Sequence, residues 1–418
     1  SEKLQYRCFS QVPAGSDCPH LSPVLHKGNL NFMNITAPCL ENQSLFYKEK
    51  RMRKKWMTWG LMAVMVTSAL AACQNQSNNE ADTVSGASIK TPREIIKSPV
   101  KKTDFLLGTA VSLSVYHPNS EALIESALEM IKDLEKRITV NASGSEVDEV
   151  NIAAGEKPVK VSADVYELIK LGLEYSAEFN GAFDITVGPL TSLWHIGFDD
   201  AKKPTQEEID AVLPLVDYKE VELNDAEQTV FLKKKGMKLD LGGIAKGYIA
   251  DKVWDYFAKE GVTTAVIDLG GNIVVMGGSP ARNGVAWNVG IQDPVESRGT
   301  TLGTILEKDK TIVTSGIYER YLKVDNQVYH HILNPKTGYP YENNIEGVSV
   351  IVNRSTKGDA LSTSMFSIGV KEGLEYANSH KDVDVIFVTK DKKVYVSDSI
   401  KETFKLTNGA LELKESIE

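Results

Sequence analysis

Apolar residues spaced three or four positions apart predict helices in the part of the chain that follows residue 104. The first helix runs over residues 121–138, and a second begins after the N-cap Ser162 and ends near residue 180. Thr205 and Glu208 form the pattern of a capping box, which predicts a short helix that stops at Pro214.

Alternating or continuous apolar runs predict strands over residues 105–116, 262–269, 273–276, 287–291, 300–306, 329–333 and 348–352, followed by a hairpin over 385–396. A further helix is predicted from Gly243 or Ile244 to about Glu260. Helices and strands mix without regular alternation, which predicts an α+β fold with mixed or antiparallel sheets and flanking helices. Because the composition does not change between residues 104 and 409, we expect one two-lobed domain there and a tail over 410–418.

The region before this domain resembles the export signal of a bacterial lipoprotein. Arg51, Arg53, Lys54 and Lys55 precede an apolar run over residues 56–72, which ends in small residues before Cys73. This pattern predicts a signal peptide over 52–72 and a lipid on Cys73, with residues 73–103 as a flexible tether. The domain would then be lipid-anchored on the extracytoplasmic face of the cell membrane. A short transmembrane anchor is the alternative, because the run is at the lower length limit of a membrane span.

Residues 1–51 lie upstream of the expected start of the signal at Met52, and we interpret them as an extension outside the natural product. They carry three of the four cysteines, Cys8, Cys18 and Cys39, so a small metal-binding or disulfide module is the alternative. No cysteine follows Cys73, which excludes disulfides and thiol chemistry from the mature domain.

The charge of the chain limits the class of ligand. The formal net charge is -9 over 418 residues, and no basic stripe with interleaved aromatic residues occurs. A nucleic-acid partner is therefore not expected. A small anionic ligand would need local positive charge or a metal.

Two segments far apart in the chain carry the residues of an anion and metal site. Residues 239–247 (LDLGGIAKG) are typical of a strand end, a glycine turn and a helix start, where the helix dipole favours an anion, and Lys246 lies one turn in. Residues 358–363 (GDALST) offer a carboxylate with hydroxyls three and four positions further on, on one face of a helix. Such all-oxygen sets suit Mg²⁺ or Ca²⁺ rather than zinc. If the segments meet, they predict a Mg²⁺ and pyrophosphate site in a nucleotide-handling enzyme.

Five motifs in order and at suitable spacing together resemble the ApbE family, the FAD:protein FMN transferases: Asp240-Leu-Gly-Gly-Ile-Ala-Lys246-Gly, Asp268-Leu-Gly-Gly-Asn272, Thr314-Ser-Gly316 with Tyr318-Glu-Arg320, His331-Ile-Leu-Asn-Pro-Lys-Thr-Gly338 and Asp359-Ala-Leu-Ser-Thr363. The resemblance covers roughly residues 104–409. It implies an α+β fold related to the T-fold, a Mg²⁺-dependent reaction, and attachment to the outer side of the membrane.

The resemblance also implies roles for individual residues. Residues matching the FAD site are Leu107, Ala182, Phe183, Asp184, Asp240, Lys246 and Ile332, and those matching the metal site are Gly243 (through its carbonyl), Asp359, Ser362 and Thr363. His331 matches the motif around the general base. Three positions depart from the family pattern: Leu107 replaces Met, Ser362 stands where relatives carry a carboxylate, and Asn334 replaces Asp, which removes a charge.

The function implied is transfer of FMN from FAD to a Thr or Ser hydroxyl of an acceptor protein, with His331 and Lys246 as catalytic residues and AMP as the second product. FAD is thus a substrate. Hydrolysis of FAD to FMN and AMP at the same site is one alternative. A lipoprotein that captures flavin without turnover is another, although such a protein needs no metal at a pyrophosphate.

Each assignment also has a purely structural alternative. Asp359 is a preferred N-cap residue and would then only cap the helix it opens. Lys246 would be a solvated helix residue, and His331 a polar residue at a strand end. Gly270-Gly271 is interpreted as a structural turn. The tryptophans Trp194, Trp254 and Trp287 are expected in the core or at its rim rather than against flavin.

Overall fold

The computed structural model describes residues 96–297 and 299–417. The chain divides into two units, Ser1–Gly86 and Ala87–Glu418, and every described residue belongs to the second. The predicted extension, signal peptide, lipid site Cys73 and most of the tether lie outside the described residues. Among the residues described, no helix combines the length and the apolarity needed to cross a bilayer.

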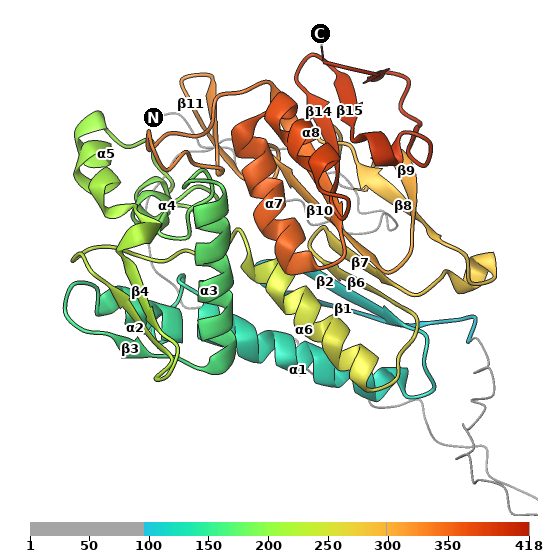
Figure 1. Cartoon of the computed structure of the whole chain (residues 1–418), viewed down its shortest axis with the longest axis horizontal. Helices are drawn as coiled ribbons and strands as arrows, with labels where there is room; N and C mark the ends of the chain where they lie inside the picture. The colour runs from blue at the N-terminus through green and yellow to red at the C-terminus, as the bar shows by residue number, and fades with distance from the viewer. Residues whose placement is uncertain (1–95, 298, 418) are drawn as a thin grey trace, which may run out of the picture. The chain divides into compact units, whose positions relative to one another are not determined.

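A nine-stranded sheet forms the centre of this unit (Figure 1). In spatial order its strands are β1 (Val100–Leu106), β2 (Thr109–Val115), β6 (Ala265–Leu269), β7 (Asn272–Met276), β10 (Lys310–Gly316), β13 (Ile345–Val352), β14 (Asp384–Thr389), β15 (Lys393–Val396) and β17 (Glu412–Lys414). All neighbours pair antiparallel except β15 and β17, which are parallel. The folded body therefore extends beyond residues 104–409 at both ends, because β1 starts at Val100 and β17 lies in the expected tail.

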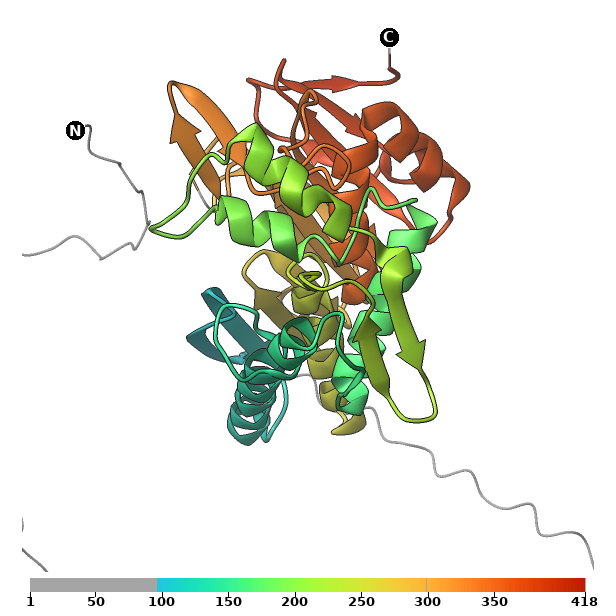
Figure 2. The same ribbon diagram turned by 90° about the vertical axis from the view of Figure 1, so that its left-hand side faces the viewer.

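Three smaller sheets accompany the large one. They are β16 (Lys405–Leu406) with β9 (Thr301–Glu307) and β8 (Trp287–Gln292), then β3 (Val159–Lys160) with β5 (Thr229–Leu232) and β4 (Val221–Asn224), and the hairpin of β11 (Tyr321–Val324) and β12 (Gln327–His330). Figure 2 shows this hairpin, in orange, beside the green helices α4 (Gly188–Trp194) and α5 (Gln206–Val212). Leu322 and Tyr329 of the hairpin share a hydrophobic cluster with Trp194 and Ile209 of these helices.

The remaining helices are α1 (Ser120–Ile138), α2 (Glu146–Ile152), α3 (Ala163–Glu178), α6 (Ala245–Lys259), α7 (Ser355–Ile368) and α8 (Val370–Ser379). Short 3₁₀ turns span Leu213–Leu215, Tyr218–Glu220, Pro280–Arg282 and Asp398–Ile400. Helices α6, α7 and α8 lie across one face of the large sheet (Figure 1).

Strand β13 shows why the core has two layers. Successive side chains point to opposite faces of a strand. Val350 accordingly belongs to the cluster with Phe366 of α7, whereas Ile351 belongs to the cluster with Ile305 of β9. Burial on both faces explains why this strand is a continuous apolar run in the sequence.

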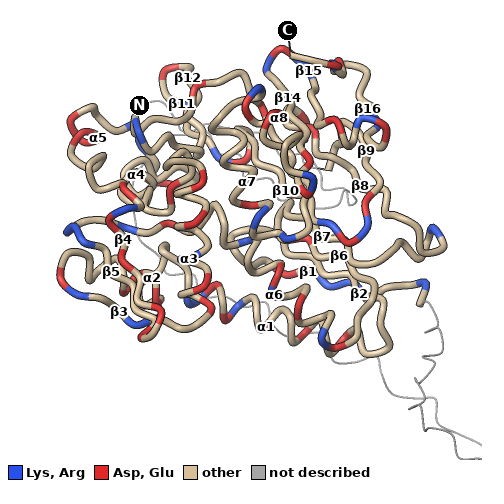
Figure 3. The backbone as a smooth tube through the Cα atoms, viewed as in Figure 1, with Lys and Arg blue, Asp and Glu red and all other residues tan. Residues whose placement is uncertain are grey.

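Lys, Arg, Asp and Glu residues of both signs are interspersed along the described chain (Figure 3).

The predicted α+β class is confirmed, as are most of the predicted elements. The helix after Ser162 is α3, the helix from residue 243 or 244 is α6, and the capping box of Thr205 and Glu208 is present with both hydrogen bonds. Gly270 and Gly271 form the predicted turn, with φ of 66° and 103°. Trp194 is fully buried, as expected for a core residue.

Other predictions were wrong in detail. The run over 105–116 is two strands, because Leu107 and Gly108 form a turn with φ of 56° and 67° between β1 and β2. The strand predicted over 329–333 ends at His330. Strand β10, between β7 and β13, was not predicted at all.

Candidate active site

Helices α6 and α7 cross at very close range, and a glycine permits the crossing. A Cβ on Gly247 would lie 2.2 Å from the carbonyl oxygen of Ser355, a distance that real Cβ atoms do not reach. Gly358 plays the same part toward the sheet, since a Cβ there would lie 2.8 Å from Cγ2 of Val313. The two motifs recognised in the sequence therefore meet at a crossing that larger residues would push apart.

Asp359 lies at this crossing and is only 4% exposed. Its Oδ2 accepts a hydrogen bond of 2.9 Å from the backbone N–H of Gly247, and its Oδ1 lies 3.7 Å from Nζ of Lys246. The N-cap alternative for Asp359 is wrong, because α7 begins at Ser355 and Asp359 lies inside it. The carboxylate instead caps the first turn of the other helix, α6, where the helix dipole favours a negative charge.

The start of α6 is consequently less open than the sequence suggests. Ala245 donates its N–H to the carbonyl of Leu241, and Gly247 donates to Asp359. The positive charge that remains available for an anion comes from the helix dipole and from Lys246, whose side chain is half-buried.

Gly243 and Thr363 lie beside each other. A Cβ built on Gly243 would be 3.6 Å from Oγ1 of Thr363 and 3.0 Å from Cε2 of Phe183. Thr363 is one turn after Asp359 on α7, so both side chains lie on one helix face. The structure thus brings together Gly243, Lys246, Asp359 and Thr363, with the buried ring of Phe183 next to them.

The donors at this place are a carboxylate, a hydroxyl and the carbonyl of a glycine turn. Within residues 96–297 and 299–417, no three His, Cys, Asp or Glu side chains cluster as metal ligands. The oxygen donors fit a hard cation such as Mg²⁺, which typically takes one or two carboxylates from the protein and completes its shell with substrate phosphates and water.

Ser362 is placed differently from Thr363. Its side chain is fully buried, donates a hydrogen bond of 2.9 Å to the carbonyl of Asp359, and lies 2.8 Å from the hydroxyl of Ser315 on β10. Because a hydroxyl has one proton to donate, Ser315 is the donor in the second bond. Ser362 thereby fixes α7 to the sheet directly behind Asp359.

Asp240 is held on both of its carboxylate oxygens. Its Oδ1 accepts from the N–H of Gly242 at 2.9 Å, and its Oδ2 accepts from the hydroxyl of Thr191 on α4 at 2.7 Å. These bonds orient the carboxylate at the glycine turn that precedes α6. Thr191 was not singled out in the sequence, because nothing local to residue 191 reveals a partner 49 positions away.

The segment of Ala182, Phe183 and Asp184 forms a tightly bonded loop after α3. The carbonyl of Ala182 accepts from the hydroxyl of Tyr341 at 2.9 Å. Asp184 accepts from the N–H and the hydroxyl of Thr186 and from the N–H of Tyr218. Burial raises the pKa of Asp184, while these hydrogen bonds favour its charged form. Because the carboxylate of Asp184 already accepts these hydrogen bonds, Asp184 stabilises the shape of the loop.

Leu107 and Ile332 lie at two other edges of the site. Leu107 occupies the turn between β1 and β2, and its N–H donates to Oε1 of Glu135 at 2.8 Å. Ile332 is buried in the cluster around α7 and follows His331 immediately. The apolar exchange of Met for Leu at residue 107 fits a packing role at a turn.

His331 ends the β11–β12 hairpin with one ring nitrogen engaged. Its Nδ1 lies 3.1 Å from the carbonyl oxygen of Arg320, which can only accept a hydrogen bond, so Nδ1 carries the hydrogen and Nε2 keeps a free lone pair. Desolvation is the largest cause that lowers the pKa of His331 to about 3; the charges of Arg320, His330 and Lys246 act in the same direction, and the hydrogen bond to the carbonyl of Arg320 opposes them. The imidazole is therefore neutral at ordinary pH. This is the state and tautomer that a general base requires.

His330 faces the other way and has a structural role. Its Nε2 donates to the carbonyl of Tyr341 at 2.9 Å, and burial lowers its pKa. Asn334 accepts from the N–H of Lys336 at 2.9 Å, which closes a turn that either Asn or Asp can form. The change of charge at residue 334 therefore leaves this local bond intact.

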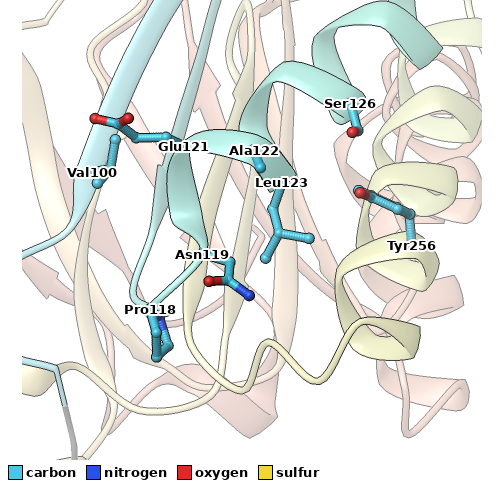
Figure 4. Close-up of a pocket in the computed structure, with 8 residues that line it drawn as sticks. All are labelled: Val100, Pro118, Asn119, Glu121, Ala122, Leu123, Ser126 and Tyr256. Atoms are coloured by element: carbon cyan, nitrogen blue, oxygen red, sulfur yellow. The ribbon is translucent and has the colours of Figure 1, made fainter.

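Two cavities lie outside this group of residues. One of about 550 Å³ is lined by β1, the start of α1 and Tyr256 of α6 (Figure 4). Another of about 470 Å³ is lined by His330, Tyr339, Tyr341 and neighbouring residues next to the hairpin. Neither contains Lys246, Asp359 or Thr363 in its lining.

Comparisons with known proteins find relatives of this chain. The sequence profile described as the ApbE family matches residues 107–387. The chain is 39% identical over 292 residues to the FAD:protein FMN transferase of Klebsiella pneumoniae (strain 342), covering 70% of this chain and 90% of the relative. It is 33% identical over 328 residues to the protein of the same name from Treponema pallidum (strain Nichols), covering 75% and 91%.

Two solved structures share the fold. The apbe protein of Thermotoga maritima aligns with a TM-score of 0.67 and 31% identity over 73% of this chain and 98% of that one. The flavin transferase ApbE of Vibrio cholerae aligns with a TM-score of 0.64 and 27% identity over 73% and 99%.

Proposed function

The chain belongs to the ApbE family, and from this membership we propose how its own residues transfer FMN. The protein is a transferase that moves FMN from FAD to a protein. The acceptor group, the metal, the roles of individual residues and the location in the cell go beyond this activity and are proposals.

The observation that carries the proposal is the meeting of Lys246, Asp359 and Thr363 with Gly243 at the α6–α7 crossing. We assign the pyrophosphate of FAD to this place. Asp359, Thr363 and the carbonyl of Gly243 would hold Mg²⁺, and Ser362 would support them from behind through Ser315. When bound, the cation would neutralise charge on the pyrophosphate oxygens.

The flavin half of FAD is assigned to the surrounding loop and turn. Phe183 adjoins Gly243, Leu107 stands at the β1–β2 turn, and Ile332 follows His331. The backbone around Ala182 and Asp184 would shape this pocket, and Asp240 would face the nucleotide from the glycine turn.

His331 is proposed as the general base. Its free Nε2 takes the proton from a Thr or Ser hydroxyl of the acceptor protein, and the hydroxyl oxygen forms a bond to the FMN phosphorus. The bond from that phosphorus to the oxygen of AMP breaks, and AMP leaves with the electron pair. Lys246 stabilises the negative charge that develops on the phosphates. FMN ends in a phosphoester with the acceptor.

The test is incubation of the full chain with FAD, Mg²⁺ and an acceptor protein purified without flavin, from cells that lack this enzyme. Yellow fluorescence that stays on the acceptor after denaturation, together with one AMP per flavin attached, supports the proposal. Mass spectrometry should place FMN on a Thr or Ser. Free FMN with no labelled acceptor would instead indicate hydrolysis, and binding without AMP would indicate passive capture.

A lipid anchor at Cys73 is a separate proposal, supported by the basic and apolar segments that precede this cysteine in the sequence. It implies work at the extracytoplasmic face of the membrane. A Cys73→Ala variant should move from the membrane fraction to the soluble fraction. Retention in the membrane would favour an uncleaved transmembrane anchor.

A further inference from the structure

Arg320 stands directly opposite His331 at the base of the β11–β12 hairpin. The strand register pairs Tyr321 with His330, so Arg320 and His331 are the next two residues facing each other. The backbone N–H of His331 donates to the carbonyl of Arg320 at 3.1 Å, which extends the ladder by one step. Directly opposed residues of antiparallel strands have Cβ atoms about 5 Å apart. The side chain of Arg320 is thus a neighbour of the proposed base.

Two glycines in turns show where the side chain of Arg320 runs. A Cβ on Gly197, in the loop after α4, would lie 3.0 Å from Cδ of Arg320. A Cβ on Gly108, in the β1–β2 turn, would lie 3.7 Å from Nη2. The stem therefore passes over Gly197, and the guanidinium reaches the turn that carries Leu107. This places the charged group between the base and an assigned flavin contact.

The guanidinium has no protein partner in the part of the chain that the structure describes. Arg137 and Arg354, by contrast, pair with carboxylates: Arg137 with Asp133 and Asp164, and Arg354 with Asp255. Arg320 also lies near the other charges of the site, because the charges of both Arg320 and Lys246 lower the pKa of His331. A planar guanidinium with all its donors free matches the oxygens of a phosphate.

We propose that Arg320 binds the non-bridging oxygens of the phosphate that carries the flavin, next to His331. The inference rests on the proposed function, because it assumes that this phosphate is attacked beside the base. Lys246 then contacts the AMP-side phosphate of the pyrophosphate at the α6–α7 crossing, and Arg320 holds the FMN-side phosphate, which points toward the hairpin. An arginine at this position would also select flavin nucleotides over flavins that lack a phosphate.

The experiment compares binding of FMN and riboflavin, which differ by this phosphate, through quenching of flavin fluorescence by the full chain. We expect Arg320→Gln to weaken FMN binding about 10- to 100-fold, as for loss of hydrogen bonds to a charged group, and to leave riboflavin binding unchanged. Arg320→Lys should retain part of the FMN affinity. Arg282→Gln is the matched control, because Arg282 is exposed on the turn Pro280–Arg282 and should change neither.

Several outcomes would overturn the proposal. Equal binding of FMN and riboflavin by the unmodified protein would show that no phosphate is recognised. Equal weakening of both ligands in Arg320→Gln would show a role in shaping the pocket, and no change in either would show no role. If the unmodified chain labels the acceptor while Arg320→Gln binds FMN normally, this inference fails and the proposed function stands. If the unmodified chain neither labels the acceptor nor releases AMP, the proposed function itself fails.

Discussion

Helices α6 and α7 cross within the core, whereas β11 and β12 form a separate hairpin with exposed side chains. At the crossing, Asp359 is 4% exposed and has partners on both carboxylate oxygens. On the hairpin, Tyr321 is 50% and Val328 48% exposed, and the two strands pair only with each other among the described strands. Both regions contribute residues to the proposed site.

The difference in burial between the crossing and the hairpin fits the two substrates of the reaction, FAD and the acceptor protein. A pyrophosphate and a cation need charges held in fixed positions, which close packing and buried hydrogen bonds provide. An acceptor protein needs a base that it can reach, which a hairpin at the surface provides. We therefore expect changes at the crossing to affect stability and activity together, and a change at His331 to affect activity much more than stability.

The largest effect is expected for Asp359→Ala. It removes the proposed cation ligand and the acceptor for the N–H of Gly247, so transfer and AMP release should fall about 10³-fold. The lost helix cap should also lower the free energy of unfolding by about 1–2 kcal/mol. Rates from labelled acceptor and unfolding in urea measure the two effects. The control Glu375→Ala, on the exposed side of α8, should change neither. Undiminished AMP release in Asp359→Ala would refute the metal assignment.

A second change tests the hairpin. His331→Gln removes the proposed base, so kcat/KM should fall about 10²-fold. Loss of the hydrogen bond to the carbonyl of Arg320 should lower the free energy of unfolding at pH 7.5 by about 0.5–1 kcal/mol, less than the loss expected for Asp359→Ala. Because the pKa of His331 is lowered to about 3, its neutral form persists down to about pH 4. We therefore expect kcat/KM of the unmodified protein to stay level between pH 8 and pH 5.

A fall in kcat/KM with a midpoint near pH 6.5 would contradict this environment of His331. A loss of stability in His331→Gln as large as that in Asp359→Ala would remove the distinction between the two regions. His380→Gln, at the exposed end of α8, is the matched histidine control and should leave the rate unchanged.

Sequence and structure agree best where the signal is local. The capping box of Thr205 and Glu208 and the course of α6 depend on neighbouring residues, and both were predicted to within a residue or two. The pairing of the two motifs could be inferred only from the resemblance, because Asp359 and Gly247 are 112 positions apart.

Strand β10 shows why the rest could not be predicted. Its hydroxyl residues weaken the apolar pattern, yet Thr311 pairs with Ser355 and Ser315 pairs with Ser362 on α7. These partners appear only once the strand lies between β7 and β13. Arg320 lies within one of the five motifs, but its position opposite His331 depends on the hairpin register. The spacing of apolar residues predicts single helices and strands, but it does not predict which distant segments pair with each other.

A smaller effect concerns the pH dependence of stability. Burial lowers the pKa of His330, so the folded protein keeps this residue neutral while the unfolded chain binds a proton below about pH 6.5. Stability should therefore decrease as the pH falls through 6.5. In His330→Gln the slope of the free energy of unfolding against pH should be smaller. The difference is at most about 1.4 kcal/mol per pH unit, which corresponds to the uptake of one proton on unfolding. Urea unfolding at pH 7.5, 6.0 and 5.0 gives both slopes. Identical slopes would mean that His330 is protonated in the folded state.

The smallest effect is expected where the segment after the hairpin joins the flavin loop, whose Phe183 adjoins Gly243 before α6. The hydroxyl of Tyr341, in the segment after the hairpin, donates to the carbonyl of Ala182 in the flavin loop at 2.9 Å. Tyr341→Phe should cost about 1 kcal/mol of stability. If that loop binds the flavin, the KM for FAD should rise about fivefold, since 1 kcal/mol corresponds to that factor, with kcat unchanged.

Tyr321→Phe, on the exposed face of the hairpin, is the matched control and should leave both constants unchanged. A fall in kcat for Tyr341→Phe at constant KM would mean that this hydrogen bond holds the base in register with the nucleotide. In that case the hairpin and the flavin loop act as one unit during transfer. The accessible base would then owe its position to the same close packing that holds the cation ligands, and the separation of roles between the two regions would be wrong.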